Sequence, residues 1–90
     1  MKEFLPIGTV VLLKEATKKI MIVGYLPITS DNKKFDYSGV LYPIGSLSPD
    51  QSLLFNSEDI DKVFFTGYKD EEYDLLIPEI NKLLTNTNPQ

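Results

Sequence analysis

The 90-residue chain contains no cysteine and no histidine, and all nine of its positively charged side chains are lysine. Without cysteine, it forms no disulfide, thiolate metal site or cysteine nucleophile. Without histidine, it lacks the usual general base at neutral pH and a main ligand of zinc and copper. Without arginine, it has no side chain that grips a phosphate through two parallel hydrogen bonds. These absences exclude most enzyme classes, and we expect neither a cofactor nor a metal.

Long apolar runs are also missing from the sequence. No stretch approaches the roughly 20 apolar residues of a membrane helix, and no apolar run of signal-peptide length follows the first residues. Secreted domains of this size usually depend on disulfides. The sequence therefore predicts a cytoplasmic protein that does not contact a membrane.

Charge is distributed unevenly along the chain, whose net charge is −4. Residues 1–34 contain six lysines and three acids, whereas residues 35–90 contain three lysines and ten acids. Proteins that bind nucleic acid usually present a basic patch and rely on arginine. An acidic chain without arginine therefore argues against a nucleic-acid partner and is compatible with binding to another protein.

Four apolar segments with short polar connections predict a β-sheet, because they are rich in β-branched and aromatic residues. The predicted strands cover residues 7–13, 20–26, 35–42 and 62–66, with a single helical turn at 56–60 before the last strand. Four glycines lie in or beside these segments, where glycine often marks a bend or bulge: Gly8, Gly24, Gly39 and Gly67. We expect a mostly antiparallel, strongly bent sheet that resembles a half-open barrel; a flat sheet is the alternative.

The C-terminal segment changes to a helical period. Apolar residues recur at three- and four-residue spacing and form one apolar strip: Tyr73, Leu76, Ile77, Ile80, Leu83 and Leu84. This pattern predicts a helix over residues 70–84 that packs on the sheet, with a kink or restart at Pro78 because proline removes a backbone hydrogen bond. Residues 85–90 are expected to form a flexible tail. Together, the segments predict a single α+β domain over residues 1–90, with its sheet within 5–68.

Acidic residues are the remaining candidates for catalysis. Paired carboxylates hydrolyse glycosides, so a hydrolase that uses acidic residues is one hypothesis. However, the acids form two runs, at 58–61 and 70–74, that resemble a helix cap and a solvated surface. Asp59 and Asp61 lack the spacing and the glycine of an EF-hand calcium loop. The sequence therefore favours a protein that is not an enzyme.

The start of the predicted helix is the candidate partner-binding surface. Its charge comes from Asp70, Glu71, Glu72 and Asp74, and its aromatic anchors are Tyr68 and Tyr73. A negative patch steers basic partners, and tyrosine provides a large contact area at a small entropic cost. In the alternative interpretation, the acids only complement the helix dipole and Tyr73 is the first core residue of the helix.

Two adjacent aromatic residues, Phe64 and Phe65, occupy the last predicted strand. Neighbouring residues in a strand face opposite sides of the sheet. One phenylalanine should therefore point away from the main core, where it either packs under the C-terminal helix or is exposed as a contact residue. We favour packing, because aromatic residues near a sheet usually find cover.

Four segments of the chain together resemble a family of small proteins of Gram-positive bacteria, catalogued as domain of unknown function 4176. The segments are residues 5–13, 19–24, 35–45 and 55–68, in this order. Members are often encoded beside the genes of type VII secretion and its LXG toxins. The resemblance implies a chaperone or targeting factor for an LXG toxin, with an immunity protein as the alternative, and it implies no catalytic residues.

Overall fold

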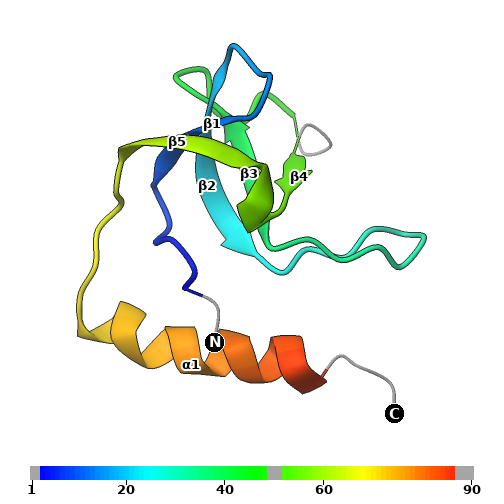
Figure 1. The fold of residues 1–90 in the computed structure, drawn as a ribbon, viewed down its shortest axis with the longest axis vertical. Helices are drawn as coiled ribbons and strands as arrows, with labels where there is room; N and C mark the ends of the chain where they lie inside the picture. The colour runs from blue at the N-terminus through cyan, green and yellow to red at the C-terminus, as the bar shows by residue number, and fades with distance from the viewer. Residues whose placement is uncertain (1–2, 49–51, 87–90) are drawn as a thin grey trace.

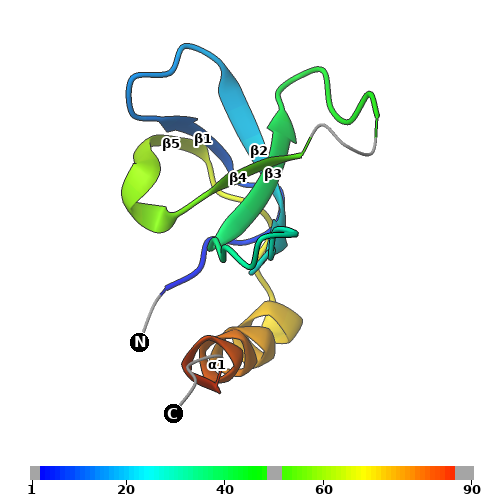
Figure 2. The same cartoon turned by 90° about the vertical axis from the view of Figure 1, so that its right-hand side faces the viewer.

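The apolar segments form an α+β fold, which the computed structural model describes over residues 3–48 and 52–86 (Figures 1 and 2). Its elements are β1 (Val10–Leu13), β2 (Lys19–Tyr25), β3 (Tyr37–Leu41), β4 (Leu53–Phe55), the 3-10 turn η1 (Ser57–Asp59), β5 (Ile60–Phe65) and α1 (Glu71–Asn86). The strands form one antiparallel sheet in the order β4-β3-β2-β1-β5. The predicted α+β class and antiparallel sheet are confirmed.

Two details of the predicted sheet are wrong. The sheet has five strands instead of four, and it is open rather than a half-open barrel. The additional strand, β4, is three residues long and follows a connection rich in proline and serine, so no alternating pattern marks it in the sequence. It forms because Phe55 and Leu53 pair with Tyr37 and Gly39 of β3, and because Phe55 is buried in the core.

The core lies on one face of the sheet, which we call the inner face. Its buried cluster combines strand residues with one residue from the N-terminal segment and one from α1: Val11, Ile20, Ile22, Tyr37, Phe55, Phe4 and Ile80. The ring of Tyr37 stacks on that of Phe55 at 5.4 Å between centroids. A Cβ atom at Gly39 would lie 2.6 Å from Cγ2 of Ile20 and 2.8 Å from the carbonyl oxygen of Met21. Glycine at this position therefore allows β3 to pack tightly against β2.

Three tyrosines fasten the N-terminal segment between the sheet and α1. The Tyr25 hydroxyl donates to the carbonyl oxygen of Leu5 at 2.6 Å, and the Leu5 amide donates to the Tyr37 hydroxyl at 2.9 Å. The Tyr73 hydroxyl donates to the carbonyl oxygen of Phe4. These bonds explain how Phe4 stays buried, with its ring against the edges of Tyr25 and Tyr37.

Helix α1 lies beyond one end of the sheet in both views, with the N-terminal segment leading toward it (Figures 1 and 2). Ile80 joins the core cluster, and Ile77 and Leu84 pack against it. The helix continues through Pro78 to Asn86, so it does not restart at Pro78 and it ends two residues beyond the predicted residue 84, whereas the alternative of a kink stays a prediction. Proline has no backbone N–H to donate to the carbonyl group one turn earlier in the helix. Because Pro78 is exposed, water can solvate that carbonyl group instead. Residues 85 and 86 are helical, and residues 87–90 of the predicted tail lie outside the described residues.

In residues 3–48 and 52–86, no helix is both long enough and apolar enough to cross a membrane.

Candidate partner-binding surfaces

The residues predicted to bind a partner lie together at the start of α1, but they divide into two groups. Tyr68 is 81% exposed, and Glu71, Glu72 and Asp74 also lie on the surface. These four side chains are accessible to a partner and form an acidic surface beside an aromatic ring. We call them the acidic surface.

Asp70 and Tyr73 have local structural roles instead. Oδ1 of Asp70 accepts a hydrogen bond from the Tyr73 amide at 3.1 Å, which makes Asp70 the N-cap of α1. Tyr73 is half-buried and bonded to the N-terminal segment, with the Lys69 ammonium 5.7 Å from its ring centroid. Burial, and secondarily the nearby Tyr37, raises the pKa of Tyr73 above its usual value. Asp70 and Tyr73 therefore stabilise the start of α1 and its contact with the N-terminal segment, and partner binding by these two residues stays a prediction.

A groove of about 390 Å³ runs between the N-terminal segment and the first turns of α1. Its walls include Glu3, Lys69 and Asp74 together with the apolar side chains of Phe4 and Ile77. The groove adjoins the acidic surface, and it carries charges of both signs.

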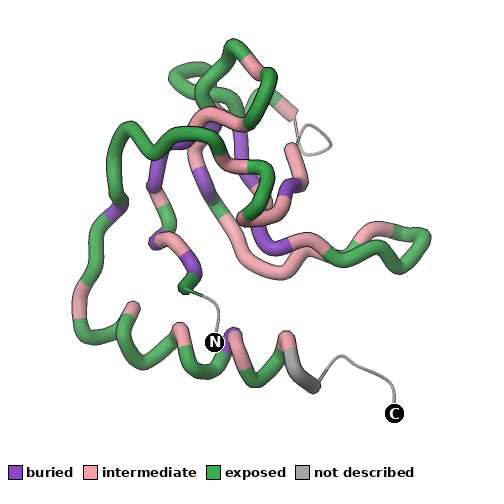
Figure 3. Tube along the Cα trace, in the orientation of Figure 1, coloured by how far each residue is buried: buried purple, intermediate pink, exposed green. Residues whose placement is uncertain are grey.

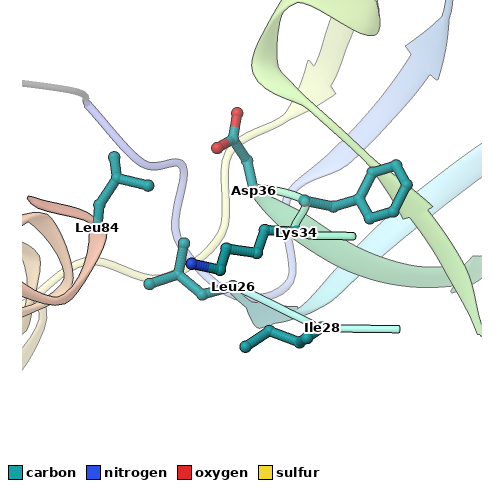
Figure 4. A pocket seen from close by; sticks show the side chains of 6 residues that line it. Leu26, Ile28, Lys34, Asp36 and Leu84 are labelled. Carbon is teal, nitrogen blue, oxygen red and sulfur yellow. The ribbon is translucent and has the colours of Figure 1, made fainter. Parts of the chain in front are cut away.

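A smaller hollow of about 80 Å³ lies between the end of α1 and the connection from β2 to β3. Figure 4 shows Leu84 of α1 on one side of this hollow, with Leu26, Ile28 and Lys34 on the other. Asp36, which also lines it, accepts a hydrogen bond from the Ser57 amide at 2.8 Å and so anchors the turn η1. A hollow of this size holds only a few water molecules, so it offers no room for an organic substrate.

A β-bulge places both Phe64 and Phe65 on the outer face of the sheet, opposite the core. Val63 pairs with Val11, but Phe65 pairs with Val10, so Phe64 is an additional residue between two register positions. Both phenylalanines line the same hollow. The prediction that they face opposite ways is therefore wrong, because a bulge breaks the two-residue alternation of a strand.

The sequence favoured packing of one of these phenylalanines under the C-terminal helix. That prediction is wrong, because the helix covers neither of them. Phe64 is 48% exposed and Phe65 is 62% exposed, whereas α1 packs at the end of the sheet. Figure 3 shows β5 exposed along most of its length. In the described part of the chain, no strand pairs with the free edge of β5. An apolar edge strand that lacks cover is a typical site of association with another chain.

The register defines two rows of side chains across the outer face. Paired residues in an antiparallel sheet share a face. The first, which we call the apolar row, contains Phe65, Val10, Met21 and Val40. The second, which we call the lysine row, contains Lys62, Leu12 and Lys19. The Lys19 ammonium also lies 4.9 Å from the ring centroid of Phe64, so the bulged phenylalanine links the two rows.

An open hollow of about 450 Å³ covers much of this outer face. Its walls come from β1, β2, β5 and the ends of neighbouring segments, and they include Val10, Lys19, Met21, Tyr42, Phe64 and Phe65. No acidic residue of the described chain lines it, and Lys19 is its only charged residue. This surface was missed from the sequence because it depends on the bulge and on strand order. The adjacent phenylalanines were the only local signal.

The acidic residues that the structure describes lie in separate places and do not gather into a metal site. The described residues contain no group of three or more acidic side chains that could hold a metal ion. Glu58 and Asp59 lie at η1, whereas the acidic surface lies at the start of α1. Hydrolysis by paired carboxylates requires two such groups facing one substrate, and a hydrolase stays an untested hypothesis.

Comparison with known proteins places the chain in a family. Searches among curated proteins and among solved structures find no match. One family, described as a domain of unknown function (DUF4176), matches residues 4–76, which include all five strands and the first turns of α1. Since this match covers most of the chain, the protein belongs to the DUF4176 family.

Proposed function

We propose that this protein is a non-enzymatic accessory factor that binds another protein, and that it acts as a chaperone or targeting factor for an LXG toxin of type VII secretion. The observation that carries the binding proposal is the exposed apolar surface of β5 and its neighbours. Monomeric proteins rarely leave large continuous apolar patches in water, and such patches commonly mark interaction sites. The association with LXG toxins rests on the resemblance of the sequence.

An immunity protein that neutralises the toxin is the second candidate. The acidic surface favours it, because Glu71, Glu72 and Asp74 are all exposed and could meet a basic region of a toxin. Under this hypothesis the protein would protect the cell that makes the toxin. Under the first hypothesis it would deliver the toxin to the secretion machinery.

Deletion of the gene in its native cell tests both candidates, with toxin export and survival of the producer measured together. Loss of export in a surviving cell is the result expected for a chaperone or targeting factor. Normal export with death of the producer would instead identify an immunity protein. If neither export nor survival changed, both candidates would be wrong, and complementation with the intact gene controls for effects on neighbouring genes.

A further inference from the structure

We propose that the outer face of the sheet docks an amphipathic helix of another protein, whose apolar strip covers the apolar row and whose carboxylates lie over the lysine row. This inference rests on the proposed function, because it names the surface and the kind of segment through which the partner is bound. It differs from the surface predicted at the start of α1, which carries the opposite charge.

The width of the outer hollow fits a helix. The hollow extends across β5, β1 and β2. Neighbouring strands lie about 4.8 Å apart, so three strands are about 10 Å wide from the first axis to the third. This is about the diameter of an α-helix with its side chains. A single extended segment would cover only about half of that width, and at the edge of β5 it would lie beside the hollow rather than over it.

The missing layer of the fold also favours a helix. A sheet with apolar side chains on both faces requires cover on both. The inner face is covered by Phe4 and other core residues, and α1 packs at the end of the sheet. Val10 and Val40 are already buried by neighbouring side chains, whereas Phe64 and Phe65 are 48% and 62% exposed. In the described part of the chain, the part of the outer face that lacks a covering layer is therefore its phenylalanine end.

The charge of the outer face determines which helix would fit. Among residues 3–48 and 52–86, neither Lys19 nor Lys62 forms an ion pair. Leu12 separates the two lysines, which lie on strands β2 and β5. Acidic side chains on both flanks of an apolar strip would meet these two ammonium groups while the strip covers Phe65, Val10 and Met21. A helix with basic flanks would be repelled.

A second copy of this chain fits the surface less well. Helix α1 has exposed leucines, Leu76 and Leu83, seven residues apart, and exposed acids beside them. Docking this helix on the outer face of another copy would join two different surfaces. Ile77, Ile80 and Leu84 of this helix already pack in or against the core of their own chain, so only part of its apolar surface is free to cover another copy. We therefore assign the site to a different protein, and self-association becomes an outcome of the test.

The test places a photoreactive benzoylphenylalanine at one of three positions in the full chain, in its native cell. Position 65 lies on the outer face, position 68 within the acidic surface and position 83 on the exposed side of α1. Phe65, Tyr68 and Leu83 are all exposed, so each replacement should leave the fold intact, which circular dichroism verifies. After illumination, mass spectrometry identifies the cross-linked segment.

The proposal predicts a cross-link from position 65 to a segment whose apolar residues recur every three or four positions with acidic residues beside them. The double change Lys19→Glu and Lys62→Glu should lower the yield of this product about tenfold. The matched change Lys33→Glu and Lys82→Glu, which alters net charge equally away from the outer face, should leave the yield unchanged.

The other outcomes separate this inference from the proposed function. Cross-links to another protein from position 68 or 83, but not from 65, would overturn the outer face as the docking site and leave protein binding in place. A product at position 65 that joins two copies of this chain, or that contains no helical apolar period, would overturn the assigned occupant. No product at any position would contradict both the inference and the proposed function.

Discussion

At the scale of single residues, tyrosine hydroxyls determine how the N-terminal segment is held. Tyr25, Tyr37 and Tyr73 each bond to the backbone of Phe4 or Leu5. Phe4 and Tyr37 belong to a core that is rich in aromatic rings, because Phe55 is buried in it with them. The hydrogen bonds could not be predicted, because each depends on the approach of residues that are 20 to 69 positions apart.

Tyr25 should make stability depend on alkaline pH. Burial, and secondarily the nearby Tyr73 and Tyr37, raises the pKa of Tyr25 to about 12 in the folded protein, against about 10 in the unfolded chain. Between pH 10 and 12 the folded state therefore holds more protons, so stability falls as pH rises; below pH 10 this contribution is constant. Because the side chain is only partly buried, we expect it to account for about 1–2 kcal/mol of that loss.

Urea denaturation of the wild type and of Tyr25→Phe between pH 8 and 12 measures this contribution. The variant should be about 1 kcal/mol less stable at pH 8, because the bond to Leu5 is lost. Its stability should then fall less steeply above pH 10. An identical slope in both proteins would assign the alkaline loss to other groups.

At the scale of elements, long patterned segments were predictable and local irregularities were not. Strands β1, β2, β3 and β5 all overlap predicted segments, and α1 follows from its three- and four-residue period. Strand β4 is too short to show a period, and it exists only through pairing with β3. The bulge at Phe64 arises from how β5 is aligned with β1, so the outer candidate site could not be located from sequence alone.

Two strand glycines should respond differently to the same substitution. In Gly39→Ala the new Cβ would lie 2.8 Å from the backbone oxygen of Met21, which cannot move without disturbing the sheet. In Gly24→Ala it would lie 2.6 Å from the Ser38 hydroxyl, which can rotate away. We expect Gly39→Ala to lower the free energy of unfolding by about 1–3 kcal/mol and Gly24→Ala by less than about 1 kcal/mol. Equal losses by chemical denaturation would show that the packing of β3 on β2 does not depend on Gly39.

The acidic surface gives a second prediction at this scale. The triple change Glu71→Lys, Glu72→Lys and Asp74→Lys spares the N-cap Asp70, so α1 should still form, with a loss of about 1–2 kcal/mol from unfavourable interactions with the helix dipole. If these acids steer a basic region of a toxin, association should slow and its salt dependence should flatten, as stopped-flow kinetics would show. Unchanged association would restrict the acids to their local role and remove the support for an immunity protein.

At the scale of the whole molecule, the chain combines two surfaces of different character. The start of α1 is acidic, whereas the outer face of the sheet is apolar with lysines beside it. Six of the nine lysines lie in residues 1–34, but this uneven distribution along the sequence does not say which face of the fold carries them. Strand order determines which lysines lie on the same face as which apolar residues. This pairing was not predictable, because no local sequence pattern indicates that β5 lies beside β1.

The central claim is that the outer face binds another protein, and the affinity of the purified chain for the LXG toxin of its own cell tests it most directly. We compare the wild type with the double variant Phe64→Thr and Phe65→Thr, since threonine is well tolerated in strands. Phe64 is about half exposed and Phe65 is more exposed still, so the melting temperature should change by only a few degrees. Removing two apolar anchors should weaken binding at least about tenfold in calorimetry. A folded double variant that binds the toxin as tightly as the wild type would contradict the account.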